Sequence, residues 1–208
     1  MKIILSLLSL VFITTAPLSA QVNAANQDTA LRLFMGVRSV GTSFTVSPPA
    51  LSGFATVLVF KDGKFWKRIG DTPIPFTFGQ TPIALGNLKA GYAPATVKVE
   101  FLWGPREGKI GYLVLGSCNS TGLIPDFHEM PELAAINTTL TDVSLDPSEP
   151  EFREMALLGA AYAMNRAPKS GSVEDAIKAA DIALIVVFKK FNSAKEAKEF
   201  IEALNKKY

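Results

Sequence analysis

Cysteine and histidine are scarce in this chain of 208 residues, which contains one of each, Cys118 and His128. A lone thiol cannot form a disulfide within the chain, so packing must supply the stability, and a chain of this length can bury a sufficient core. Zinc sites combine several cysteine and histidine ligands, so the chain holds no zinc site of familiar spacing. We expect no metal and no cofactor, with Cys118 either free or in a disulfide between chains.

A large excess of one charge is also missing. The chain has 21 Lys and Arg against 19 Asp and Glu, a formal net charge of +2, whereas nucleic-acid-binding domains concentrate positive charge. After residue 25, no segment offers the run of about 20 apolar residues that a membrane-spanning helix needs. We therefore expect no nucleic-acid partner and no transmembrane span in the mature chain.

The N terminus reads MKIILSLLSLVFITTAPLSAQVNAA. Lys2 precedes an apolar stretch over 3–13 and small residues follow, which is the pattern of a secretory signal peptide. The stretch is too short to span a bilayer as a helix. We expect a signal peptide within 1–25, cleaved after Ala20 or Ala25, and export of the protein to the periplasm or outside the cell.

Apolar residues alternate with a two-residue period through much of 28–145. The segment 54–60 is apolar on both faces, which is typical of a strand covered on both sides. Prolines and glycines interrupt the pattern often, as in sandwiches with a turn roughly every 8 to 12 residues. The pattern predicts an antiparallel β-sandwich of immunoglobulin-like or transthyretin-like type over 28–145. Its predicted strands are 31–38, 42–46, 54–60, 97–103 and 109–115.

Two hairpin turns are predicted inside the sandwich. Asp62-Gly63 is a preferred pair for a two-residue turn with positive φ at both positions. The sequence GPREG at 104–108 predicts a five-residue turn between the last two strands.

Helical signals replace the strand pattern after Asp146. The last segment places Ala197, Phe200, Ile201 and Leu204 on one side and Lys and Glu elsewhere, as an amphipathic helix does. A serine followed three positions later by an acid is a helix-start signal, and it occurs three times: Ser148 with Glu151, Ser172 with Asp175, and Ser193 with Glu196. We predict about three helices over 149–207, either as a separate domain or covering the sandwich.

The middle helical segment permits two interpretations. Residues 173–181 favour a helix, but 182–188 are rich in β-branched residues, which favour strands. One buried helix from about 173 to 191 is the preferred interpretation, because no Gly or Pro interrupts it. The alternative is helix–strand–helix, with the strand joining a sheet edge.

The segment 83–99, IALGNLKAGYAPATVKV, resembles a stretch of carboxypeptidase-regulatory and transthyretin-like sandwiches. In those domains an apolar strand and a Leu lead to a Gly-x-Tyr turn and then to a Val-x-Val strand. The matching residues are Leu88, Gly91, Tyr92, Val97 and Val99, with APAT inserted after the Tyr. The resemblance implies a sandwich and no particular activity.

Cys118 lies among turn residues in GSCNSTG, ten positions before His128. A thiol nucleophile needs a base within hydrogen-bond reach and a third group that orients the base. The hypothesis is a catalytic pair of Cys118 and His128, oriented by Asp126 or Glu129. The competing interpretation is an inert thiol or a disulfide between chains.

The hairpin FATVLVFKDGKFWKRIG at 54–70 sets two aromatics among basic residues. The structural interpretation makes Phe65 or Trp66 part of the core, with lysines protecting a sheet edge. The functional interpretation is a binding surface of Lys64, Trp66 and Arg68 for a protein, carbohydrate or anionic surface, because Trp and Arg dominate binding hot spots.

Small residues at 156–163 permit close approach of another element, so a homodimer seam on a helix over 151–166 is an alternative to packing within the chain. No Gly-x-Ser-x-Gly elbow and no phosphate-binding loop occurs. We expect an exported, non-catalytic binding, accessory or structural protein. The alternative is a small hydrolase or thiol-dependent enzyme that uses Cys118 and His128.

Overall fold

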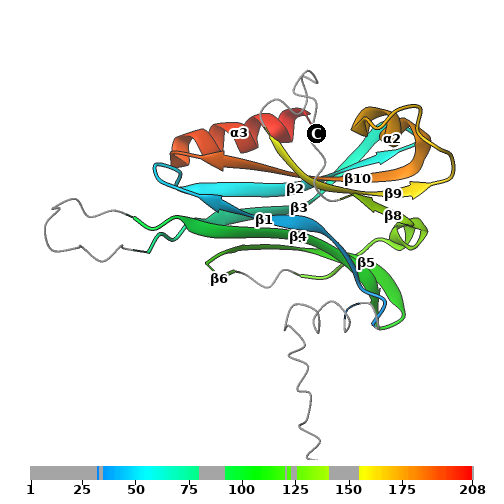
Figure 1. Cartoon of the computed structure of the whole chain (residues 1–208), viewed down its shortest axis with the longest axis horizontal. Coiled ribbons are helices and arrows are strands. Elements are labelled where there is room, and N and C mark those ends of the chain that lie inside the picture. Colours follow the sequence, from blue (N-terminus) through cyan, green and yellow to red (C-terminus); the bar gives the residue numbers. More distant parts are fainter. Residues whose placement is uncertain are drawn as a thin grey trace, which may run out of the picture.

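Two antiparallel sheets pack face to face in the computed structural model of the chain, and two helices cover the outer face of one of them (Figure 1). The structure describes residues 32, 35–79, 92–119, 121–122, 126–140 and 155–207. Within these residues, no helix has the length and apolar character needed to cross a membrane. The predicted antiparallel sandwich is confirmed, whereas its immunoglobulin-like or transthyretin-like type stays a prediction.

The first sheet has the strand order β1-β4-β5-β6, and β7 also pairs with β5. Its strands are β1 (Arg38–Val46), β4 (Ala95–Arg106), β5 (Lys109–Cys118), β6 (Thr121–Gly122) and β7 (His128–Glu129). The second sheet has the order β3-β2-β10-β9-β8. Its strands are β2 (Ser52–Lys61), β3 (Lys64–Pro75), β8 (Thr138–Leu140), β9 (Ala156–Met164) and β10 (Ala180–Phe191). The helices are the 3-10 helix η1 (Pro131–Ala135), α2 (Val173–Ala179) and α3 (Ala194–Lys207).

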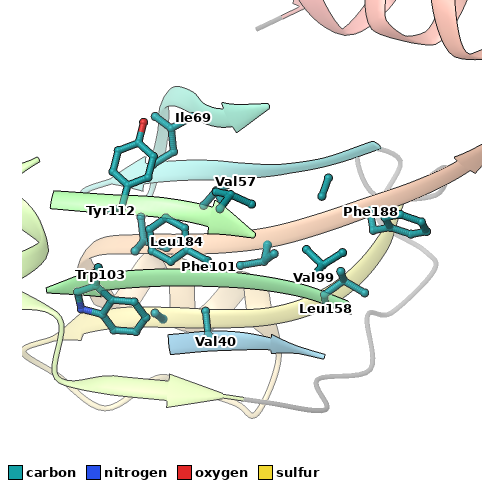
Figure 2. Close-up of a cluster of buried hydrophobic side chains, with 14 of the residues drawn as sticks. Val40, Val57, Ile69, Val99, Phe101, Trp103, Tyr112, Leu158, Leu184 and Phe188 are labelled. Carbon is teal, nitrogen blue, oxygen red and sulfur yellow. The ribbon is translucent and has the colours of Figure 1, made fainter. Parts of the chain in front are cut away.

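Alternate residues of β4 and β5 fill the space between the sheets, as the two-residue period predicts. Phe101 is fully buried, and its ring centroid lies 5.5 Å from that of Tyr112 and 5.6 Å from that of Trp103 (Figure 2). The second sheet contributes Val57 and Leu184 to the same cluster, both fully buried (Figure 2). Aromatic rings bury large areas and gain further energy from their mutual geometry, so this cluster stabilises the packing of one sheet on the other.

A second cluster fills the space between the second sheet and the helices. Leu58 and Ile185 lie on the outer faces of β2 and β10, and Leu204 of α3 packs in the same cluster. Residues Gly53 to Phe60 are therefore buried throughout, because β2 has the first sheet on one face and helices on the other. The two-sided burial of 54–60 and the apolar face of the last helix are confirmed.

Tyr162 of β9 belongs to this second cluster. Its side chain is fully buried, and its hydroxyl has no hydrogen-bond partner among the described residues. Burial raises its pKa from the ordinary 10.0 to about 12, because the phenolate would lose its hydration. The core around Tyr162 therefore packs against the ring, but no described residue replaces the hydrogen bonds that the hydroxyl makes with water in the unfolded chain.

We expect Tyr162→Phe to raise the free energy of unfolding by about 1–2 kcal/mol, because removing an unsatisfied buried hydroxyl removes its desolvation cost. Because the pKa of the hydroxyl is raised on folding, the unfolded chain ionises first, and the wild type loses stability as the pH rises from 10.0 towards about 12. Tyr162→Phe should not show this loss. Urea denaturation at pH 7 and at pH 9 to 11 measures both effects. A variant less stable than the wild type at pH 7 would show that the hydroxyl is hydrogen-bonded. If the variant lost as much stability as the wild type at alkaline pH, the loss would come from a group other than Tyr162.

The prediction of about three helices over 149–207 is wrong. Between 155 and 207 the chain forms two strands, β9 and β10, and two α-helices, α2 and α3. The alternative interpretation of helix, strand and helix is confirmed for 173–207, but the strand is central rather than at an edge, since β10 lies between β2 and β9. A central strand is buried on both faces and needs a continuous apolar run, which 182–188 supplies.

The first predicted helix coincides with β9. Ala160 and Ala161 are fully buried on opposite faces of this strand, one in each core cluster. The small residues therefore fill the interior of the chain, and the helical seam that suggested a homodimer does not exist. The predicted start at Ser148 and Glu151 lies outside the described residues.

The two hairpin turns have the same form. Asp62 and Gly63 have φ values of 51° and 75°, which confirms the predicted two-residue turn. The five-residue turn over 104–108 is wrong, because Glu107 and Gly108 form a second two-residue turn with φ of 53° and 79°. Pro105 lies inside β4, where it is tolerated because the pairing of β4 with β1 ends at Trp103.

The first predicted strand, 31–38, is wrong, because among its described residues Arg32 is helical and only Arg38 belongs to a strand. Met35 and Gly36 form a turn, and β1 begins only at Arg38. β1 ends at Val46, directly before Ser47-Pro48-Pro49, as 42–46 predicted. Gly36 has a φ of 70°, a conformation that glycine adopts without strain.

Candidate functional site

The predicted catalytic pair is not brought together. Cys118 ends β5, is 1% exposed, and its Sγ lies 3.3 Å from the backbone N of Thr77. His128 lies on β7 opposite Tyr112, which precedes Cys118 by six residues on β5. At about 3.4 Å per residue of strand, the thiol and the imidazole are roughly 20 Å apart. This separation exceeds hydrogen-bond reach, so His128 cannot act as the base for the Cys118 thiol in this arrangement.

His128 and Asp126 instead share a cleft with Arg68, which the sequence had placed in a different candidate site. This polar cleft lies between β3 and β5 and has a volume of about 400 Å³. Its polar side chains are Arg68, Asp71, Thr72, Tyr112, Asp126 and His128. The topology explains why these residues share a cleft, because β3 and β5 lie in different sheets and pack against each other at one side of the sandwich.

Arg68 is held within the fold. Its Nε and Nη2 atoms donate to the two carboxylate oxygens of Asp71 at 3.0 and 2.8 Å, and Nη2 also donates to Asn205 of α3. The hydroxyl of Thr56 donates to the same carboxylate at 2.7 Å. The Arg68 side chain is 12% exposed. Its charge is already paired, so Arg68 ties β3 to β2 and α3 rather than presenting a cation to a partner.

Tyr112 and His128 form the aromatic side of the polar cleft. Their ring centroids lie 5.4 Å apart, with the planes inclined by 33°. Burial, and then the negative charge of Asp71, raises the pKa of the Tyr112 phenol. The phenol therefore stays protonated at neutral pH and can act as a hydrogen-bond donor, and the His128 ring beside it is exposed to solvent.

The tip of the β2–β3 hairpin is the second candidate surface. Trp66 is 38% exposed, while Phe65 turns inward and meets Phe60 edge to face at 5.9 Å. The core interpretation therefore holds for Phe65, and Trp66 is the aromatic that reaches the surface. The sequence named both alternatives without deciding between them.

Two lysines lie against the exposed indole, and a third lies beside them at the turn. The Nζ atoms of Lys67 and Lys61 lie 4.1 and 5.3 Å from the centroid of the Trp66 ring, within the range of a cation–π interaction. Lys64 is exposed and pairs with Lys61 across the turn. None of the three forms an ion pair with a described residue. We call Lys61, Lys64, Trp66 and Lys67 the hairpin tip.

The hairpin tip differs from the predicted surface in two members. Lys67 lies over the indole where Arg68 was expected, and Lys61 joins from the other strand. Register shifts between Ala55 and Val57 and between Val59 and Phe60 interrupt the simple alternation of the β2–β3 pair. The cross-strand position of Lys61 could have been predicted from the Asp62-Gly63 turn, which places Lys61 opposite Lys64.

No family model, curated protein or solved structure matches this chain. The resemblance of 83–99 to transthyretin-like sandwiches therefore stays a prediction. Residues 83–91 lie outside the described residues, Tyr92 is exposed, and Val97 and Val99 are buried in β4.

Proposed function

We propose that the chain is an exported, non-catalytic binding protein that contacts an anionic partner through the hairpin tip. The observation that carries the proposal is the exposed Trp66 ring beside lysines with no ion pair among the described residues. An exposed indole offers a large contact area, and lysines without acidic partners can meet a negative group without first breaking an ion pair.

The charge around the indole favours an anion. Three lysines face one acid of the turn, Asp62, whose side chain is also exposed. Each lysine is a flexible point charge, which suits phosphate, sulfate or carboxylate groups at variable positions. The signal-peptide pattern of 1–25 supports an exported protein, whose partners are then extracellular or periplasmic. Recovery of the protein outside the cytoplasm, with an N terminus at residue 21 or 26, tests the export.

Tryptophan fluorescence tests the surface directly, because the chain has two tryptophans and Trp103 is 3% exposed. We expect acrylamide to quench mainly Trp66, and Trp66→Phe to remove that component. Dextran sulfate should protect Trp66 from the quencher at low salt and lose this effect at high salt, because screening weakens contacts between exposed charges.

The lysines are tested by charge reversal with a matched control. Lys64→Glu with Lys67→Glu should weaken dextran sulfate binding at least tenfold, about 1.4 kcal/mol. Lys169→Glu with Lys206→Glu makes the same change of net charge at exposed sites outside the hairpin tip, and we expect a much smaller loss. Equal losses in the two variants, or a Trp66 that acrylamide does not reach, would reject the hairpin tip as the binding surface.

A further inference from the structure

A second cleft opens between β1 and the strands β9 and β10. Its volume is about 690 Å³, within the range of small-molecule sites. Its lining is mainly apolar and includes Phe44, Val46, Met155, Leu158 and Phe188. We call it the apolar cleft.

The sheet topology explains why the sandwich is open here. Among the described strands, β1 lies at an edge of its sheet and pairs with β4 alone. Among the described residues, β8 covers β9 from Ala160 to Tyr162, and the start of β9 has no further neighbour on that side. β10 also continues past the start of β9, since Phe188 pairs with Ala156. No described residue therefore covers the inner faces of the two sheets at this point.

Phe188 gives the apolar cleft a preformed floor. Its ring packs edge to face on Phe44 at 4.8 Å between centroids. Gly53, on the neighbouring β2, leaves the room for this ring, because a Cβ atom there would lie 2.3 Å from it. A side chain fixed in this way does not have to be ordered when a ligand binds, which lowers the cost of binding.

Lys190 stands at the mouth of the apolar cleft. Ile182, Leu184, Val186 and Phe188 of β10 face the interior of the sandwich, and Lys190 is the next residue of this period. It is exposed and lines the cleft, and its ammonium group forms no ion pair or hydrogen bond with a described residue. Closed sandwiches keep lysine out of inward-facing positions, because a buried charge needs a partner.

We propose that the apolar cleft binds a small amphipathic anion, with its apolar chain against Phe44, Leu158 and Phe188 and its carboxylate at Lys190. The apolar walls gain about 0.8 kcal/mol for each methylene group that they cover. The ammonium of Lys190 at the rim, which has no ion pair with a described residue, selects a negative head group by charge complementarity. This site is independent of the hairpin tip, because Lys61 pairs with Ile182 at the far end of β10, eight residues and roughly 27 Å from Lys190.

Calorimetric titration of the full exported chain with laurate, below its micelle concentration, tests the proposal. We expect one laurate per chain, weaker binding of dodecanol, and weakest binding of the dodecyltrimethylammonium cation. Lys190→Gln should weaken laurate binding about tenfold and leave dodecanol binding nearly unchanged. Lys206→Gln removes an exposed lysine on α3 and should have no effect on either probe.

A second variant tests the apolar walls without opening the core. Ala156 is exposed and lines the apolar cleft, so Ala156→Phe fills the cleft and should abolish laurate binding while the unfolding transition stays unchanged. The hairpin-tip variant with Lys64→Glu and Lys67→Glu should bind laurate as the wild type does. Equal binding by wild type and Lys190→Gln, or equal binding of the cation, would overturn the proposal. So would a dimer in light scattering that Ala156→Phe dissociates, because a second copy would then occupy the cleft.

Discussion

Phe101→Ala is expected to lower the free energy of unfolding by about 3–5 kcal/mol, the range for removal of a large buried ring. Phe101 is fully buried at the centre of the sandwich and packs on both Tyr112 and Trp103 (Figure 2). Its loss leaves a cavity that close packing between two sheets cannot fill without moving a strand. Domains of this size are stable by only 5–15 kcal/mol, so the loss is a large part of the total.

Urea denaturation followed by far-ultraviolet circular dichroism measures this loss as a shift of the midpoint at constant slope. Thr96→Ala is the matched control, because Thr96 lies on the same strand with its side chain exposed. We expect the control to cost less than about 1 kcal/mol, the span of intrinsic strand preferences. Similar losses in both variants would contradict a core between β4 and the second sheet.

The strands that alternate cleanly were predictable from local sequence. In β4 and β5 every second residue is apolar, and one face of each strand is in the core between the sheets. Asp62 and Gly63 also determine their turn locally, since both adopt positive φ. In these segments the local preference and the tertiary packing agree, so the sequence pattern alone is sufficient to predict the strands and the turn.

β9 and β10 could not be predicted from local sequence. The alanines of β9 favour a helix in isolation, and the continuous apolar run of β10 has no period that distinguishes a buried strand from a buried helix. Their strand form depends on pairing with β2, in which Leu184 lies opposite Val59, more than a hundred residues earlier. Such long-range pairing leaves no local signal.

The residues that share the polar cleft also could not be predicted fully from local sequence. Arg68 and Asp71 are three residues apart and could have been paired from the sequence, but nothing local indicated that Asp126 and His128 share their cleft. Cys118 and His128 are ten residues apart in the chain, yet they lie far apart along β5. Distance in space follows from strand pairing, and sequence separation does not substitute for it.

Asp71→Ala is expected to lower the free energy of unfolding by about 2–4 kcal/mol. The substitution leaves the guanidinium of Arg68 without its anion in a largely buried position, and breaking such a pair from one side costs about 3–5 kcal/mol when both groups are buried. Asp71 is 43% exposed, so water that takes the place of its carboxylate solvates the guanidinium and offsets part of the lost stability. The Nη1 atom of Arg68 is already buried without a hydrogen-bond partner among the described residues, which leaves Arg68 little room to adapt.

Two further variants separate the charge from the packing. Arg68→Met with Asp71→Ala should regain most of the lost stability, because an apolar side chain of similar length needs no anion. Glu174→Ala removes an acid from the exposed pair with Lys178 and should cost less than about 1 kcal/mol. If the double variant were no more stable than Asp71→Ala, the loss would come from the backbone of β3 and not from an unpaired guanidinium. Recovery would instead show that Arg68 and Asp71 neutralise each other within the fold, which leaves the lysines of the hairpin tip as the cations available to a partner on that strand pair.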